Sequence, residues 1–180
     1  MSLKNLFDLN GKTAIVTGSS KGIGKAIAGA FATHGANVVI SSRKAPACEV
    51  AASEINALGA GRAVSIPANI ASKDDLAALV AGARAEFGQI DIVVCNAATN
   101  PYFGPQQDIS DDQFEKILRN NIISNHWLVQ MTAPEMRARR DGAIIIVSSI
   151  GGYRGSGVVG AYNICKAADF QLSRNLAVGF

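Results

Sequence analysis

A tyrosine and a lysine stand four positions apart in the stretch AYNICK. On a helix, Tyr162 and Lys166 lie one turn apart on the same face. A tyrosine is a poor base at neutral pH, but a nearby ammonium group favours its phenolate form. Such a pair can transfer a proton to or from a substrate oxygen. The same spacing also arises by chance, so its meaning depends on the residues that surround it.

Other polar side chains stand where the strands expected at 90–97 and 142–149 come to an end. Asn96 is near the end of the first strand, and Ser148 and Ser149 close the second. Ligands of parallel sheets bind at the carboxyl ends of strands. These residues are therefore candidates for a binding site, while serines at such positions also act as plain turn formers.

Asn121 is a polar residue on an apolar helical stripe. It follows Phe114 and Leu118 with the i, i+4, i+7 spacing of one helix face. A polar group on a packing face normally has a hydrogen-bonding partner. Both a ligand and an internal bond to the backbone remain open as that partner.

A glycine-rich turn joins the first expected strand to the first expected helix. The sequence TGSSKGIG has the spacing Gly-x-x-x-Gly-x-Gly. It provides a tight turn, room for a pyrophosphate to approach, and a helix N-terminus aimed at that pyrophosphate. A phosphate-loop nucleotidase is disfavoured because Ala26 follows Lys25, where a metal-binding serine or threonine is needed. The turn predicts a dinucleotide site, with a purely structural turn as the alternative.

The second expected strand ends in cations. The stretch SSRK at 41–44 contains no carboxylate, and the next acidic residue is Glu49. An acid at this position would bind the adenosine ribose of NAD, whereas arginine suits the 2′-phosphate of NADP. Together with Lys21, the cations Arg43 and Lys44 favour NADP(H) over NAD(H). The alternative is that they are solvated surface charges.

Composition narrows the class of protein. The 180 residues are 48% hydrophobic and 17% charged, which suits one domain over 1–180 with a sheet buried on both faces. The net charge of +3, without a basic stripe, disfavours nucleic-acid binding.

Neither MSLKNLFDLNGK nor any later stretch has the apolar length of a signal peptide or membrane span. Cys48, Cys95 and Cys165 are too scattered for a metal site, and a cytoplasmic protein is expected.

Strand and helix patterns alternate along the whole chain. Strands are expected at 12–18, 36–42, 61–68, 90–97 and 142–149, and helices at 23–35, 45–58, 72–88, 110–139 and from Ala161. We expect the fourth helix to bend near Pro134. The apolar run GAIIIVSS is typical of a parallel strand covered on both faces. The alternation predicts an α/β fold, a Rossmann-like doubly wound sheet of five parallel strands.

The order of these motifs resembles one family over the whole chain. TGSSKGIG, CNAA, Asn121, IVSSIGG and YNICK follow one another as in the classical short-chain dehydrogenase/reductases. SSRK and NAATNPYFG look most like the carbonyl and retinol reductases of that family, which use NADPH. Each motif is weak alone, but the five in this order are specific.

The resemblance implies four catalytic residues and a carbonyl or secondary alcohol substrate. Tyr162 is the implied acid/base and Lys166 the group that holds the nicotinamide ribose and favours the phenolate. Ser149, thirteen positions before Tyr162, is implied to hold the substrate oxygen, and Asn121 to support a water in the proton relay. A homodimer or homotetramer through the fourth and the tyrosine-bearing helices is also implied. The implied cofactor-binding residues are Gly18, Ser20, Lys21, Gly22, Ile23, Gly24, Ser42, Arg43, Lys44, Asn69, Ile70, Asn96, Ala97 and Ala98, with Tyr162 and Lys166.

The sequence departs from the family pattern at several positions. Ala98 stands where the family has glycine, Asn69 where it has aspartate, and Cys165 where serine is usual. We expect Cys165 to be a packed thiol, with an oxidation-sensitive thiol as the alternative. Tyr102, Phe103 and Tyr153 either line an apolar pocket or pack the loops.

Family members continue past the last helix through two more strands, a Pro-Gly loop and a mobile substrate-covering segment. We therefore expect a sheet that is incomplete at its C-terminal edge, with an unpaired strand that favours association. A second hypothesis follows, in which a truncated relative keeps the fold and binds nucleotide with little turnover. An epimerase-like or dehydratase-like member is a third hypothesis, disfavoured by the glycine spacing.

Overall fold

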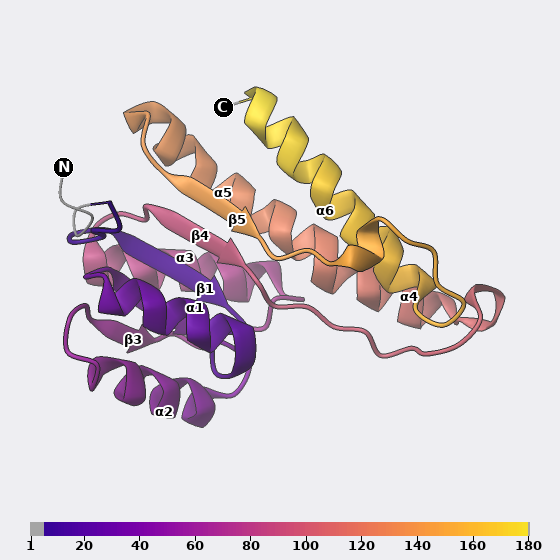
Figure 1. Ribbon diagram of the computed structural model, residues 1–180, viewed down its shortest axis with the longest axis horizontal. Helices are drawn as coiled ribbons and strands as arrows, with labels where there is room; N and C mark the ends of the chain where they lie inside the picture. The colour runs from indigo at the N-terminus through magenta and orange to yellow at the C-terminus, as the bar shows by residue number, and fades with distance from the viewer. Residues whose placement is uncertain (1–5, 180) are drawn as a thin grey trace.

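Five parallel strands form a single sheet in the computed structural model, which describes residues 6–179 (Figure 1). The strands are β1 (Thr13–Thr17), β2 (Asn37–Ser41), β3 (Ala63–Ser65), β4 (Ile92–Cys95) and β5 (Ala143–Ile146). Their spatial order is β3-β2-β1-β4-β5, and every pairing is parallel. The strand order reverses between β1 and β4, which makes their carboxyl ends the place where such sheets bind ligands. The predicted parallel α/β sheet is confirmed.

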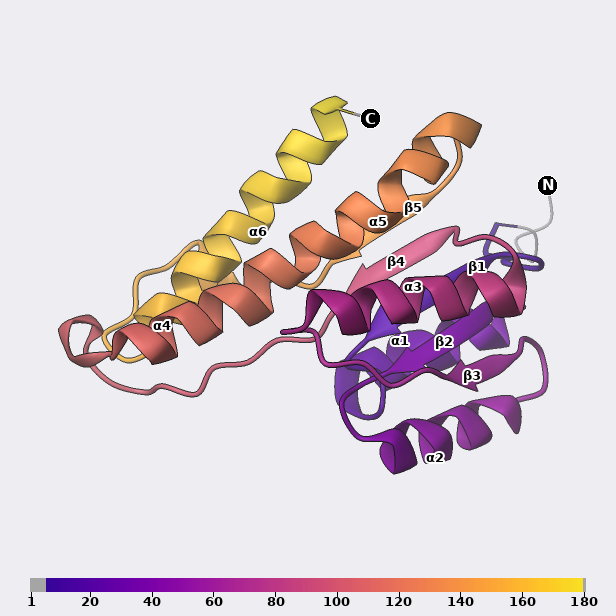
Figure 2. The same cartoon turned by 180° about the vertical axis from the view of Figure 1, so that it is seen from behind.

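Helices cover both faces of this sheet (Figures 1 and 2). The helices are α1 (Gly22–Thr33), α2 (Ala45–Asn56), α3 (Lys73–Phe87), α4 (Asp111–Leu118), α5 (Ser124–Arg139) and α6 (Gly160–Gly179). Alternate strand residues point to opposite faces. Val16 therefore packs in one core cluster with Ala28 of α1, while Ile15 packs in another with Leu76 of α3 and Leu128 of α5.

The last helix, α6, packs on another helix instead of on the sheet. Ala161 and Cys165 of α6 join Ile117 of α4 in a small buried cluster of their own. Figures 1 and 2 both show α6 running beside the arm formed by α4 and α5. The helix that carries Tyr162 is thereby placed against the helix that precedes Asn121.

The expected helix over 110–139 is not one regular helix. A π-helical turn, Arg119–Ile123, separates α4 from α5, whereas Pro134 lies inside α5 without interrupting it. Ser124 Oγ donates to the carbonyl oxygen of Asn120 at 2.7 Å, and Asn125 Nδ2 donates to that of Asn121 at 2.8 Å. These side chains bind carbonyl groups that the wider turn frees from regular α-helical bonding. The irregularity thus falls beside Asn121, and not where the proline pattern predicted it.

The fifth strand is less covered than its composition predicted. Ala143 and Ile145 are exposed, with 42% of Ile145 accessible, because α5 packs on only one face of β5. Among residues 6–179, β5 pairs with β4 alone. The prediction of cover on both faces is therefore wrong for the described sheet. The apolar run shows that these side chains suit burial, but it does not specify which segment covers them.

The helices of the structure can be compared with the length and apolar character that a membrane span requires. Within the described part of the chain, none of the helices is both long and apolar enough to cross a bilayer. Residues 1–5 of the N-terminal stretch considered above, and Phe180, lie outside the described residues.

Candidate active site

The glycine loop is packed closely against the end of β4. Gly18 and Gly22 have φ values of 67° and 59°, in the left-handed region that glycine adopts without strain. A Cβ on Gly24 would stand 2.5 Å from both the Gly18 carbonyl oxygen and Asn96 Nδ2. Glycine is thus favoured at positions 18 and 22 by the backbone conformation, and at position 24 by the close packing around it.

The first helix begins with its amide groups free of a side-chain cap. Lys21 is the N-cap residue of α1, its backbone is extended, and its side chain makes no capping hydrogen bond. A Cβ on Gly22 would meet no atom within 4 Å, so the space over the turn is open. The first amides of α1 can therefore donate to an anion, which is the property that a pyrophosphate site requires. This arrangement fits a dinucleotide.

Two hydroxyl groups that the sequence reasoning missed tie the glycine loop to the neighbouring strands. Thr17 Oγ1 accepts hydrogen bonds from the backbone amides of Asn96 and Ala97, each at 3.1 Å. Ser19 Oγ accepts from the backbone amide of Ser41 at 2.9 Å. In the sequence, the hydroxyl residues Thr17 and Ser19 on either side of Gly18 could have indicated such a role. Which strands they hydrogen-bond to depends on the fold.

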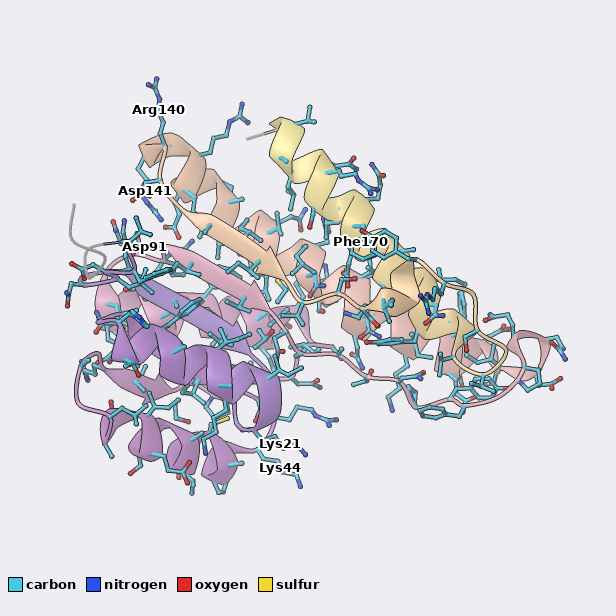
Figure 3. All side chains as sticks on the ribbon, in the orientation of Figure 1. Lys21, Lys44, Asp91, Arg140, Asp141 and Phe170 are labelled. Atoms are coloured by element: carbon cyan, nitrogen blue, oxygen red, sulfur yellow. The ribbon has the colours of Figure 1, made fainter. Side chains whose placement is uncertain are left out.

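The predicted cations lie at the same edge of the sheet as the glycine loop. Register pairs Thr17 with Ser41, so the residues that follow β1 and β2 emerge side by side. Lys21, Arg43 and Lys44 are exposed, and no ion pair holds any of them among residues 6–179. Figure 3 labels Lys21 and Lys44, which project into solvent at this end of α1 and α2. Three unpaired cations at one edge form a surface suited to a phosphate group.

Asn69 takes part in the turn that starts α3. Its backbone amide donates to Asp75 Oδ2 at 3.0 Å, and its own Oδ1 accepts from the amide of Ala71 at 3.2 Å. The Asn69 amide and the Ser72 hydroxyl lower the pKa of Asp75. Ile70 beside it is partly buried against the core on the α3 face. The Asn69 side chain is exposed, and its NH₂ group donates to no group among the described residues, so it remains available to a ligand.

The side chain of Asn121 is fully engaged with backbone groups. Its Oδ1 accepts from the amide of Thr99 at 3.0 Å, and its Nδ2 donates to the carbonyl oxygens of Thr99 and Ile117, each at 2.8 Å. Asn121 therefore fastens the loop after β4 to the π-helical turn. Of the two partners left open by the sequence, the backbone is the one that the side chain uses, and the implied water relay stays a prediction.

The two serines after β5 have different partners. Ser148 Oγ donates to the carbonyl oxygen of Lys166 at 2.9 Å, which commits its hydroxyl proton to the backbone of α6. Ser149 caps the short 3₁₀ helix Ile150–Gly152, where its Oγ accepts from the Gly151 amide at 3.1 Å. The Ser149 hydroxyl proton has no acceptor among the described residues. Ser149 is therefore the serine that can donate to a ligand.

Tyr162 and Lys166 occupy one face of α6, as their spacing predicted. Lys166 Nζ lies 5.6 Å from the centre of the half-buried Tyr162 ring. Lys166 itself is 3% exposed, and its Nζ donates to the carbonyl oxygen of Val147 at 2.8 Å and to Asp169 Oδ2 at 2.9 Å. The ammonium group is thereby anchored where β5 gives way to the serines.

The thiols next to this ion pair are packed in the interior. Burial, more than the charge of Asp169, raises the pKa of Cys95 to about 12 and that of Cys165 to about 11. Both thiols therefore stay protonated at neutral pH. The expectation that Cys165 is a packed thiol is confirmed by its complete burial.

The aromatic residues near the site differ in their surroundings. The Tyr102 hydroxyl donates to the carbonyl oxygen of Pro105 at 2.8 Å, and its ring packs on the α4–α6 cluster. Phe103 and Tyr153 are exposed, and the Tyr153 ring stacks on Phe170 with 4.3 Å between centroids. Figure 3 shows Phe170 on α6, above the arm of α4 and α5. Tyr102 thus packs its loop, while Tyr153 and Phe170 form an exposed aromatic pair.

Metal ligands are not gathered anywhere in residues 6–179. No group of three or more His, Cys, Asp or Glu side chains lies close enough together to hold an ion there.

Similar curated proteins share most of this chain. It is 39% identical over 170 residues to dehydrogenase/reductase SDR family member 4 of Oryctolagus cuniculus. The aligned region covers 94% of this chain and 65% of that protein. It is 40% identical over 171 residues to the mitochondrial dehydrogenase/reductase SDR family member 2 of Homo sapiens, covering 94% of this chain and 60% of that protein. The chain thus spans less than two thirds of the length of these relatives.

Similar solved structures share the fold. A 7α-hydroxysteroid dehydrogenase complexed with NADH and 7-oxo glycochenodeoxycholic acid has a TM-score of 0.93 and 36% identity, covering 99% of this chain and 69% of that one. A metagenomic short-chain oxidoreductase in complex with NADP has a TM-score of 0.90 and 32% identity, covering 95% and 77% of the two chains. The sequence model of the family described as short chain dehydrogenase matches residues 12–179. With this match over nearly its whole length, the chain belongs to the short chain dehydrogenase family.

Proposed function

We propose that the chain is an oxidoreductase that transfers a hydride between NADP(H) and a ketone, aldehyde or secondary alcohol, with Tyr162 as acid/base. The observation that carries this proposal is the pair on α6. Lys166 holds a buried ammonium group beside the Tyr162 ring, and the Ser149 hydroxyl, which follows strand β5, has no acceptor for its proton among the described residues. A phenol and a free hydroxyl can both donate to a carbonyl oxygen that is being reduced, and a nearby ammonium favours the phenolate that remains when the phenol gives up its proton.

Similar proteins support this class of chemistry. One structural neighbour is described as holding NADH with a 7-oxo steroid, and another as holding NADP. The curated relatives are named dehydrogenase/reductases. A nicotinamide dinucleotide and an oxo or hydroxyl substrate are therefore the ligands that we propose for this chain.

Each residue of the proposed site has a distinct task. The first amides of α1 bind the pyrophosphate, and Lys21, Arg43 and Lys44 bind a 2′-phosphate. The bound nicotinamide supplies or accepts the hydride. Ser149 donates a hydrogen bond to the substrate oxygen, and Tyr162 gives that oxygen a proton in reduction or removes one in oxidation.

A second candidate function is nucleotide binding with little turnover. The observation that favours it is the exposure of the groups around Ser149, since 71% of Tyr153 is accessible and Ile150 is also exposed. An active site that is open to water weakens the electrostatic interactions on which proton and hydride transfer depend. The experiment below distinguishes the two functions.

NADPH oxidation with a panel of ketones and aldehydes tests the proposal. We expect turnover by the wild type and a loss of at least about 100-fold in kcat for Tyr162→Phe, because the acid/base is removed while the ring remains. Calorimetric titration of both proteins with NADPH shows whether nucleotide binding survives. Equal rates for the two proteins would remove Tyr162 from the mechanism, and binding without turnover by the wild type would establish the second function.

The choice of cofactor has its own test. Arg43→Asp places a carboxylate at the end of β2, so we expect NADPH affinity to fall and NADH affinity to rise relative to the wild type. Arg174→Asp, on an exposed position of α6, is the matched charge reversal. An unchanged preference for NADPH in Arg43→Asp would remove the phosphate site from the proposal.

A further inference from the structure

A carboxylate that the proposed chemistry does not use is buried behind the tyrosine and lysine pair. Asp169 lies one turn after Lys166 on α6 and is only 1% exposed. It bonds Lys166 Nζ at 2.9 Å through Oδ2 and Asn125 Nδ2 at 3.1 Å through Oδ1. The two carboxylate oxygens therefore have partners on two different helices, Lys166 on α6 and Asn125 on α5.

Such a group is costly to keep in the interior. Loss of solvation raises the pKa of Asp169, and the hydrogen bonds from Lys166 and Asn125 offset this only in part. A well-packed apolar residue in place of a buried ion pair is often neutral or stabilising. A contribution to stability is therefore a weak explanation for the carboxylate of Asp169. Its effect on the position of Lys166 and Asn125 explains it better.

Asp169 limits where the Lys166 ammonium can point. A lysine ammonium has three donors. Val147 and Asp169 each accept one of them, which leaves one N–H of Lys166 for a ligand. Without the carboxylate, Val147 would be the single acceptor among residues 6–179, and the long side chain would be free to rotate about that one bond.

Asn125 extends the same set of bonds to the π-helical turn. Its Nδ2 donates both to Asp169 and to the carbonyl oxygen of Asn121, at 2.8 Å for the latter. A continuous buried path of side chains thus runs from Lys166 through Asp169 and Asn125 to the turn that carries Asn121. This path ties α6 to the helix on which Asn121 lies.

We propose that Asp169, held by Asn125, is a positioning residue that fixes Lys166 so that its remaining N–H is directed at the nucleotide. This inference rests on the proposed function and on the role that the family resemblance implies for Lys166, which is to bind the nicotinamide ribose. Asp169 touches neither substrate nor cofactor in this arrangement. It acts through Lys166 alone.

A double-mutant cycle tests that dependence, with the dissociation constant of NADPH measured by calorimetry in Asp169→Asn, Lys166→Met and the double variant. We expect Asp169→Asn to weaken NADPH binding about fivefold in the wild-type background and not at all in the Lys166→Met background. Where turnover is measurable, we also expect kcat to fall about tenfold with the KM for the carbonyl substrate nearly unchanged. Thr132→Val, which removes a buried hydroxyl bonded to the Leu128 carbonyl on α5, is the structural control and should leave binding unchanged.

The outcomes separate this inference from the proposed function. Failure of the wild type to bind NADPH, or wild-type affinity in Lys166→Met, would overturn the function and the inference with it. Weak binding by Lys166→Met together with wild-type binding by Asp169→Asn would overturn the role of Asp169 alone, as would equal effects of Asp169→Asn in both backgrounds. If circular dichroism shows that Asp169→Asn is unfolded, Asn125→Ala replaces it in the same cycle, with a smaller loss of the same sign expected.

Discussion

Asn121 shows how far one side chain can be committed to structure. All three hydrogen bonds of its side chain go to the backbone of Thr99 and Ile117. In Asn121→Ala the buried carbonyl group of Ile117 and the partly buried backbone groups of Thr99 lose their partners, so we expect the free energy of unfolding to fall by about 2–4 kcal/mol. Urea unfolding measures this loss. Asn175→Ala on the exposed part of α6 is the control, and a change in Asn121→Ala as small as in that control would contradict the structure.

Cys95 predicts a dependence of stability on alkaline pH. Burial raises its pKa from 9.0 to about 12, so above pH 9 its thiol ionises in the unfolded chain but not in the folded one. The contribution of Cys95 is therefore complete below pH 9 and is lost as the pH rises toward 12. We expect the stability of the wild type to fall more steeply between pH 9 and 10.5 than that of Cys95→Ala, by about 1 kcal/mol per pH unit. Parallel curves from urea unfolding would show that the thiol is not buried.

At the level of elements, Gly24 and Gly29 of α1 have different surroundings. A Cβ on Gly24 would come within 2.5 Å of the Gly18 carbonyl oxygen, whereas a Cβ on Gly29 would meet only Leu58 Cδ1 at 3.7 Å. We expect Gly24→Ala to displace the glycine loop, with loss of stability and at least about tenfold weaker NADPH binding. Gly29→Ala should stabilise the helix by about 0.5–1 kcal/mol and leave binding unchanged.

Thermal unfolding and NADPH titration of the two glycine variants measure these effects side by side. Because both substitutions add one methyl group to the same helix, a general effect of alanine on α1 would change both variants alike. Tight NADPH binding by Gly24→Ala would mean that the loop does not need the close packing seen here.

At the level of the whole molecule, the outer side of β5 is an exposed apolar surface. Ile145 is 42% exposed on one face of this strand, and on the other face a hollow is lined by Ile144 and Ile146 together with Met136 of α5 and Leu176 of α6. Unpaired strand edges with apolar side chains favour association between chains. We expect the chain to self-associate at micromolar concentrations and Ile145→Lys to shift it toward monomer.

Sedimentation velocity over a range of protein concentrations measures this shift. Val50→Lys is the matched control, because Val50 is also an exposed aliphatic residue, 58% accessible, but lies on α2. Equal association of Ile145→Lys and the wild type would show that the edge of β5 is not the contact. That outcome would favour the expected homodimer or homotetramer through α4, α5 and α6.

Much of the fold and part of the site were predictable from local patterns. Alternating strand and helix signals predicted the parallel sheet, and the four-residue spacing predicted that Tyr162 and Lys166 share a helix face. These predictions succeed because the 3.6-residue helical repeat and the alternation along a strand depend on neighbours within a few positions.

Contacts between residues far apart in the chain were beyond such patterns. Thr17 meets Asn96, and Asn125 meets Asp169, because separate elements pack together. The prediction that β5 is covered on both faces was wrong for the same reason. An apolar strand sequence indicates that its side chains suit burial, but it does not indicate which segment packs on them. The types and order of the chemical groups are properties of the chain alone. Which of them keep a free donor is set by packing, because each buried polar group takes its partner from whatever element the fold brings beside it.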